Sequence, residues 1–242
     1  MKRTTTVLLL VCGITISTGI VRADDDHNNN NQGLQAVPSV FVGTAPGCAP
    51  FPAGSNIVTS AWLTGMGLPD NGSSNVTPST PPNRDPHYGL LLSKNGATAD
   101  CAAAQATITG AQGTVITLTT EFGFDYRNGG HCGAGAPRFN VTTSDNPNVV
   151  HFAGCAGGTR TPAPQDPAQW SRVRFVPAQF FPPIVPGTRI VSIGIVFDEG
   201  TDNPSLDDPN GVGLAVIDNI DVNGKLITQG PKGNNNGDHN DD

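Results

Sequence analysis

Tryptophan, tyrosine and glutamate are scarce in this chain of 242 residues. It contains two tryptophans, two tyrosines and two glutamates, Glu121 and Glu199. Sugar sites often stack the sugar on an aromatic ring, so this scarcity weighs against a ring-lined sugar surface. Most glycosidases use a pair of carboxylates, but no Glu-x-Asp-x-x-Glu pattern is present. The Gly-x-Ser-x-Gly turn of serine hydrolases is also absent, so no catalytic residue is predicted.

The N-terminus has the order of a secretory signal peptide. Lys2 and Arg3 precede an apolar run from Val7 to Val11, and small Ala23 precedes the polar stretch "DDDHNNNNQG". This order predicts a signal peptide over residues 1–23 and a secreted protein, extracellular or periplasmic. A transmembrane helix is less favoured because threonines and glycines interrupt the run. A lipoprotein signal at Cys12 is less favoured because Val11 is bulky.

Basic residues are few once that segment is removed. Loss of Lys2, Arg3 and Arg22 from the 13 basic residues leaves ten against 20 acidic residues, a formal charge of −10. So negative a protein is not expected to bind nucleic acid or an anionic membrane. No later apolar stretch is long enough to predict a membrane anchor.

Four cysteines remain after cleavage, and none has the Cys-x-x-Cys spacing of zinc or redox motifs. An even number of cysteines in an exported protein favours disulfides. Three pairings are open. We favour Cys48 with Cys101 and Cys132 with Cys155, because each pair joins sequence neighbours and the second would brace a hairpin.

Composition and periodicity predict β structure. The chain has 30 glycines and 21 prolines, and apolar residues alternate with polar ones at period two in several segments. We expect strands at 114–126, 138–143, 148–153, 170–176, 189–197 and 213–222, with weaker ones at 57–63, 88–92 and 105–109. These strands fit one antiparallel two-sheet sandwich of jelly-roll type over residues 34–229. The segments 24–33 and 230–242 are Asn, Asp and Gly rich and are expected to be disordered, and 69–86 is expected to be a surface loop.

Asp218 interrupts the apolar pattern of the last expected strand. Simple alternation places it on the core side together with Val216 and Ile220. A buried carboxylate without partners would cost several kcal/mol. Asp218 must therefore accept hydrogen bonds from loop amides, meet a cation or take a proton.

The same region carries a family resemblance. "AVIDNIDVNG" (215–224) resembles the final strand of jelly-roll, galactose-binding-like domains, which are common as carbohydrate-binding modules in secreted bacterial proteins. "RIVSIGIVFDEG" (189–200) is similar to their penultimate strand, and the resemblance covers residues 187–224. It implies a jelly-roll fold, a calcium ion that is often structural, and a sugar site on a concave sheet face or in end loops.

An acidic stretch before the last strand is the candidate calcium site. Calcium prefers roughly six to eight oxygen ligands. We expect Asp198, Glu199 and Asp218 as ligands, with Asp202, Asp207 and Asp208 close by in sequence. The spacing is not that of an EF-hand. A solvated acidic loop is the alternative, because charge runs usually face water.

A second candidate site combines the polar faces of two strands. Trp170, Arg172 and Arg174 alternate to one side of "WSRVRFV", and Glu121 and Asp125 alternate to the polar side of their strand. An exposed ring with planar guanidinium and carboxylate groups could hold a glycan. The alternative is a cross-strand ladder of arginines and acids, with Trp170 capping the edge of the sandwich.

Three classes of function stay open. A non-catalytic glycan-binding or polysaccharide-binding module is favoured, with an extracellular glycan as partner. A structural or surface-assembly protein without a small ligand is the second hypothesis. A glycoside hydrolase-like enzyme is the third, because its carboxylate pattern is incomplete.

Overall fold

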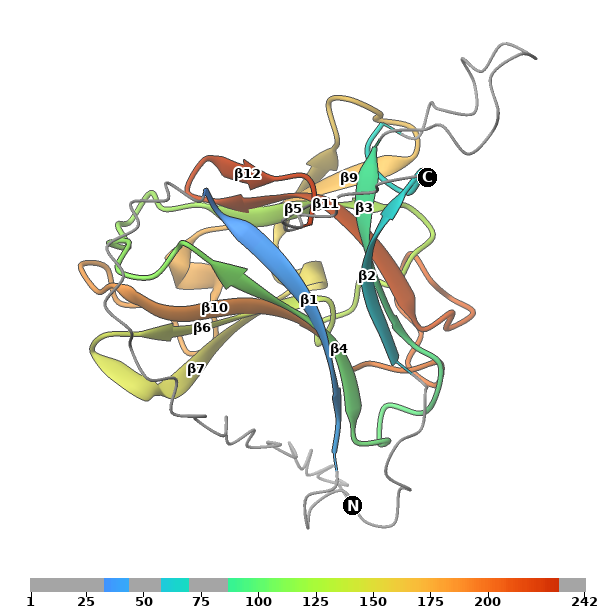
Figure 1. The fold of residues 1–242 in the computed structure, drawn as a ribbon, viewed down its shortest axis with the longest axis horizontal. Helices are drawn as coiled ribbons and strands as arrows, with labels where there is room; N and C mark the ends of the chain where they lie inside the picture. Colours follow the sequence, from blue (N-terminus) through green and yellow to red (C-terminus); the bar gives the residue numbers. More distant parts are fainter. Residues whose placement is uncertain (1–32, 44–57, 70–86, 231–242) are drawn as a thin grey trace, which may run out of the picture.

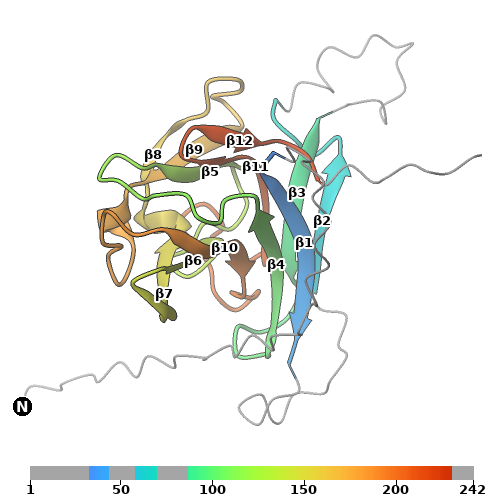
Figure 2. The same ribbon diagram turned by 60° about the vertical axis from the view of Figure 1, so that its left-hand side comes forward.

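The computed structural model describes residues 33–43, 58–69 and 87–230. They form two antiparallel sheets packed face to face, which confirms the all-β sandwich (Figures 1 and 2). The predicted signal peptide, the predicted disordered tails beyond residues 33 and 230, and most of the 69–86 loop lie outside the described residues. These expectations stay predictions.

The strand order is that of a jelly roll. The smaller sheet has the order β1-β4-β10-β6-β7, and the larger has the order β2-β3-β11-β5-β9-β8, with β12 added to β11. The pairs β3 with β11, β4 with β10, β5 with β9, and β6 with β7 are nested from the outside inward along the chain. Members of successive pairs alternate between the two sheets, as in a long hairpin rolled into a sandwich. The topology therefore confirms the jelly-roll prediction.

The expected strands are all present, β5 only in the second half of its expected range, and three further strands were not predicted. Their bounds are β1 (Gln35–Val42), β2 (Val58–Thr64), β3 (Tyr88–Lys94), β4 (Ala102–Thr109), β5 (Phe122–Arg127), β6 (Arg138–Thr143), β7 (Asn146–Gly154), β8 (Thr159–Pro162), β9 (Trp170–Phe175), β10 (Ile190–Phe197), β11 (Leu214–Val222) and β12 (Lys225–Ile227). Sequence periodicity did not predict β1, β8 and β12. All three border other strands on one side only, and β8 and β12 are short, so their alternation signal is weak.

The strand expected at 114–126 is wrong in its first half. Regular strand begins only at Phe122, and Leu118 is exposed. The hydroxyl of Thr120 accepts a hydrogen bond from the backbone N–H of Thr117, at 2.8 Å. A side chain that bonds the local backbone in this way competes with a sheet ladder. The segment therefore turns before it joins the sheet.

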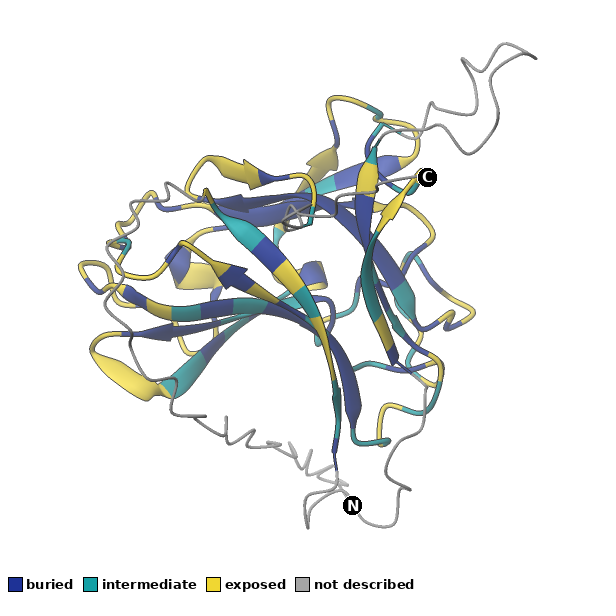
Figure 3. Cartoon of the chain, in the orientation of Figure 1, coloured by how far each residue is buried: buried dark blue, intermediate teal, exposed yellow. Residues whose placement is uncertain are grey.

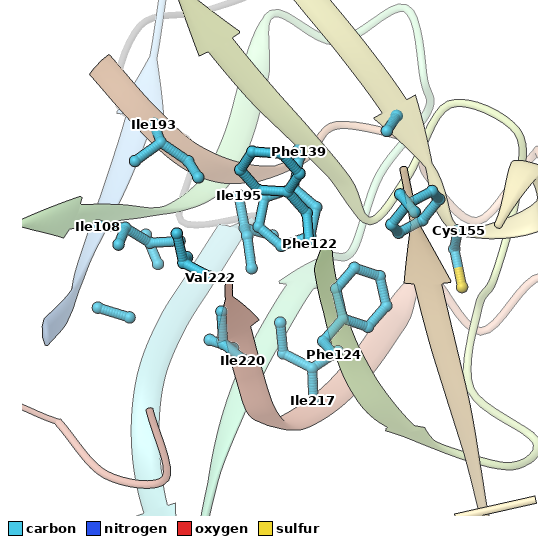
Figure 4. Packing of buried hydrophobic residues seen from close by; sticks show 14 of the residues in the cluster. Ile108, Phe122, Phe124, Phe139, Cys155, Ile193, Ile195, Ile217, Ile220 and Val222 are labelled. Atoms are coloured by element: carbon cyan, nitrogen blue, oxygen red, sulfur yellow. The ribbon is translucent and has the colours of Figure 1, made fainter. Parts of the chain in front are cut away.

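The core lies between the sheets and is rich in phenylalanine. Phe122 and Phe124 from β5 pack on Phe139 from β6, with ring centroids 6.0 and 5.8 Å apart. Ile195 and Ile217 lie close to these rings (Figure 4). Figure 3 shows the buried residues concentrated along the central strands. β1 and β2 adjoin at the other side of the sandwich, where the indole N–H of Trp62 bonds the carbonyl of Ala36 at 2.9 Å.

The disulfide between Cys132 and Cys155 is confirmed. It joins the loop after β5 to the end of β7, and both sulfur-bearing residues are buried. Cys48 lies outside the described residues, so its pairing with Cys101 stays a prediction. The helices of the described residues include the single turns η2 (Cys155–Gly157) and η3 (Pro177–Gln179). No helix in the described part of the chain is long and apolar enough to span a membrane.

Candidate ligand-binding face and the acidic loops

The outer face of the larger sheet carries a charged ladder across β5 and β9. Phe122, Phe124, Val173 and Phe175 belong to the core, so the alternate residues of the two strands point away from it. In the strand register, Asp125 lies opposite Arg172. The sequence therefore placed Asp125, Arg172 and Arg174 on the same face correctly.

Asp125 is the centre of this ladder, and it is 0% exposed. Arg172 donates to it through Nε at 3.0 Å and through Nη2 at 3.3 Å. Arg174 Nη1 and the side-chain amide of Asn219 also donate to the carboxylate, at 3.3 and 2.9 Å. The full set of contacts offsets the cost of burying one carboxylate. It also leaves Asp125 no surface to offer a ligand.

Arg174 extends the ladder to two further acids. Its Nε lies 3.3 Å from Glu121 Oε1 and 3.5 Å from Asp221 Oδ2. Gly123 makes room for this side chain, since a Cβ there would lie 2.4 Å from Arg174 Cδ. Burial raises the pKa of Asp221, while the N–H of Gly224 and the charge of Arg174 act in the opposite direction. The structure thus brings together four of the five residues predicted for the ligand site, in the arrangement of a cross-strand ladder.

The prediction of an exposed Trp170 is wrong, because its side chain is 0% exposed. Trp170 points to the outer face, as expected, but Leu68, Ala163 and Val216 bury it there in a second apolar cluster. Leu68 belongs to the segment after β2, which crosses the face of β3 and β11 at this point. The ring is therefore a core residue of a second, smaller core and cannot stack on a sugar.

Asp218 is buried, but on the other face from the one predicted. Val216 lies in the outer cluster, whereas Ile217 and Ile220 both lie in the main core. The register with β5 shifts between Asp218 and Asp221, which marks a β-bulge. Asn219 has φ +45° within it, a conformation that Asn adopts more readily than most residues. The bulge breaks the simple alternation, and residues 214–218 consequently face opposite to the prediction.

Loop and strand amides compensate the Asp218 carboxylate. Its Oδ2 accepts the backbone N–H of Leu68 at 2.8 Å, and its Oδ1 accepts that of Asn219 at 2.6 Å. Burial raises the pKa of Asp218 to about 6, against the opposing effect of these two N–H groups. Asp218 thereby fastens the segment around Leu68 over the bulge. Of the three ways to compensate a buried Asp218, namely amide hydrogen bonds, a cation or a proton, the structure shows the amide hydrogen bonds.

The acidic stretch lies at one end of the sandwich, where several of its acids have a protein partner. The carboxylate of Asp198 pairs with both terminal nitrogens of Arg138, one of them at 2.7 Å. Glu199 lies 2.7 Å from Nε2 of His131. His131 is fully buried, and its Nδ1 lies 3.5 Å from Asp208 Oδ2. Glu199 therefore fixes the imidazole ring through Nε2, while Nδ1 faces Asp208 without a hydrogen bond to it.

Asp207 and Asp208 also have hydrogen-bond donors within the protein. Tyr126 donates its hydroxyl to Asp207 at 2.6 Å, and Arg160 lies 2.6 Å from the same oxygen. Burial opposes ionisation of Asp207, but these two donors hold its pKa below the ordinary value. Asp208 accepts the N–H of Val212 at both oxygens, at 2.9 and 2.7 Å.

The three predicted calcium ligands are not brought together. Asp198 pairs with Arg138, Glu199 with His131, and Asp218 with the N–H of Leu68 on the outer face of the larger sheet. Among the residues that the structure describes, no group of three or more His, Cys, Asp and Glu side chains could hold a metal ion. Calcium binding stays untested, but these three residues do not form a common ligand set.

The sequence indicated which acids are important, but it did not indicate which residues bind them. The roles of Asn219 and Leu68 were not predicted. Asn219 within "IDNIDV" could have indicated a bulge, because Asn tolerates positive φ. Nothing local could have paired His131 with Glu199, since 68 residues separate them.

Comparison of the chain with protein-family models, curated proteins and solved structures finds no match.

Proposed function

We propose that the protein is a secreted, non-catalytic glycan-binding module whose ligand lies on the outer face of the larger sheet. The observation that carries the proposal is the state of Arg172. Asp125 holds its guanidinium by two hydrogen bonds, yet the side chain is 28% exposed. An arginine fixed from below in this way presents its remaining donors in a constant orientation, which lowers the entropy lost on binding a hydroxyl-rich ligand.

Neighbouring side chains support the same proposal with acceptors and hydroxyls. Glu121 is 48% exposed beside Arg174. Thr161 on β8 lies opposite Arg172, and Thr159 lies opposite Arg174; both are exposed. Polar side chains for a ligand are therefore present on β8, on β9 and directly before β5. With Trp170 buried, such a face would bind through hydrogen bonds rather than ring stacking.

The experiment is a glycan array, followed by titration calorimetry with the glycan that binds best. Arg172→Lys keeps the charge but loses the planar fork, so we expect at least about a tenfold loss of affinity. Glu121→Gln should weaken binding to a lesser degree. Lys225→Ala removes an exposed charge on β12 and is the matched control. Binding equal in all four proteins would refute this face as the site.

The array is repeated in chelator, because the calcium expectation is independent of the ladder. Binding of a glycan only in the presence of calcium would indicate a site formed by residues other than those of the ladder. A glycan bound equally in both conditions supports recognition by the arginines and Glu121.

A structural role without a small ligand is the second candidate, and a different region favours it. Leu118, Phe181 and Val185 are exposed at 78, 75 and 56%. They lie on the two loops after β4 and after β9, which bond to each other at Gly187 and Ile116. Failure of every glycan to bind, together with self-association that Phe181→Ser abolishes, would favour this alternative.

A glycosidase is supported least. Asp125 would have to act with Glu121, but Asp125 is fully buried and bonded by two arginines and Asn219. A catalytic carboxylate must reach the glycosidic oxygen or the anomeric carbon. Hydrolysis of any bound glycan that Asp125→Asn abolishes would restore this hypothesis.

A further inference from the structure

Lys94 ends β3 and is 1% exposed, an unusual burial for a lysine. Its Nζ donates to three main-chain carbonyl oxygens, those of Thr98 at 2.9 Å, Asp100 at 2.6 Å and Asp198 at 2.8 Å. An ammonium group has three N–H donors, so each is used. We call these three oxygens the carbonyl cage.

The carbonyl cage is built where two loops distant in sequence are clamped together. Asp202 Oδ1 accepts both the backbone N–H and the hydroxyl of Thr98, at 2.6 and 2.8 Å. Thr201 N–H bonds the carbonyl of Gly96 at 2.9 Å. A Cβ at Gly200 would lie 2.0 Å from that carbonyl oxygen, so the loops meet at a distance that only glycine permits. These contacts hold the two loops together, and none of them involves the ammonium.

The surroundings of the cage favour a positive charge. Burial lowers the pKa of Lys94, and the nearby charges of Asp198, Asp100 and Asp202 oppose this effect by stabilising the ammonium. Carbonyl oxygens that converge on one point have their negative ends together, which is unfavourable without a cation between them. Carbonyl and carboxylate oxygens are also the ligands that hard cations prefer.

We infer that the carbonyl cage is a cation-binding site whose resident cation is the Lys94 ammonium, and that it accepts a small cation from solution when that ammonium is removed. The resident ammonium joins β3 to the loops 95–101 and 198–202 without an exogenous ion. A lysine that is merely buried would predict a loss of stability on substitution, but no recovery with added cations.

The test compares Lys94→Ala, Lys94→Met, Lys225→Ala and the wild type by scanning calorimetry. We expect Lys94→Ala to lower Tm by about 10 °C, because it leaves the cage oxygens without a cation. Calcium, potassium and propylammonium chlorides are added separately at matched ionic strength, with choline chloride as the bulky control. At least one small cation should restore about half of the lost Tm in Lys94→Ala.

Lys94→Met should lose a similar amount and should not recover, since its longer apolar side chain fills the path that an ion would use. Lys225→Ala should match the wild type in every salt. The inference is overturned if Lys94→Ala melts within about 2 °C of the wild type, or if each cation raises its Tm no more than that of the wild type. If Lys94→Ala folds in none of the salts when refolded in their presence, the cage does not accept an ion from solution, and the inference fails.

A second measurement uses the unaltered protein. Acetic anhydride acetylates accessible amines, and mass spectrometry locates the products. Acetylation of Lys94 should be about 100-fold slower than that of exposed Lys225, because its amine becomes accessible only when the loops open. Equal rates would show that Nζ is not held in the cage, and would overturn the inference independently of any variant.

Discussion

The charged ladder on β5 and β9 and the acidic loops at the end of the sandwich both concentrate carboxylates, but they compensate them differently. On the ladder, the strand register sets Asp125 opposite Arg172, so regular pairing positions the charges. In the loops, partners come from scattered positions, such as His131 for Glu199 and the N–H of Val212 for Asp208. The ladder therefore depends on side chains that a period-two pattern places. The loops depend on contacts that form only after the fold has closed.

Within the ladder, Asp125 is fully buried whereas Glu121 is exposed, so we expect their substitutions to differ in effect. Asp125→Ala leaves two arginines without their shared acid, and we expect it to lower the free energy of unfolding by about 3–5 kcal/mol. Glu121→Ala removes an exposed partner of Arg174 and should cost less than about 1 kcal/mol. Urea denaturation of both variants checks the difference. Equal losses would mean that the two acids do not differ in their structural role.

The disulfide is linked directly to the acidic loops, since Cys132 follows His131. Cys132→Ser should cost about 2–5 kcal/mol, the usual loss for a native bridge in a small secreted domain. Thermal melts of the variant and the wild type measure it, with Cys155→Ser expected to behave alike. A change within experimental noise would show that the loops are held by their hydrogen bonds alone.

Asp218 belongs to the ladder face but is compensated by amides, as the loop acids are. Its pKa of about 6 lies above its ordinary value of 3.8, so the folded protein holds a proton that the unfolded chain releases between these values. Stability from this group is present below pH 3.8 and is lost as the pH rises through 6, a change of about 3 kcal/mol. Unfolding free energies of the wild type and Asp218→Asn, measured from about pH 3 to about pH 8, isolate this contribution.

As the pH rises through this range, the unfolding free energy of the wild type should fall by about 3 kcal/mol relative to that of Asp218→Asn. The shift should be the same in chelator and in calcium, because the partners of Asp218 are N–H groups. A chelator-induced loss of stability in the wild type that Asp218→Asn abolishes would instead make Asp218 a calcium ligand.

Tyr126 joins β5 to the acidic loops, and its hydroxyl is expected to contribute less than Asp125, the disulfide or Asp218. Tyr126→Phe removes the hydroxyl donor of Asp207 but leaves Arg160 in place, so we expect a loss of about 1–2 kcal/mol. Burial and the bond to Asp207 also raise the pKa of Tyr126 above its ordinary value of 10.0. Ultraviolet titration should show one of the tyrosines ionising late, and Tyr126→Phe should remove it. An unchanged titration would contradict the buried contact.

Local pattern was sufficient for the sandwich, for most strands and for the neighbouring arginines and acids. Alternation places Arg172 and Arg174 on one side of a strand whatever the rest of the chain does. The predicted orientation of side chains was wrong on β11, where one extra residue in a β-bulge reverses which side chains face the core. Because of the bulge at Asp218–Asp221, Leu214, Val216 and Asp218 face outward, and the position of the bulge depends on the pairing of β11 with β5.

The sequence by itself determined the jelly-roll type of sandwich and the side of the strand to which Trp170 points. The tertiary structure decided the burial of Trp170 and the pairing of Glu199 with His131. Period-two patterning determined the sheets, because side-chain alternation is a property of each strand alone. Trp170 faces outward by that rule, yet Leu68 covers it from a segment that no local pattern brings near. Glu199 and Lys94 likewise find their partners across 68 and 104 residues of chain. Burial and charge compensation are properties of the closed fold, because they depend on which segments meet.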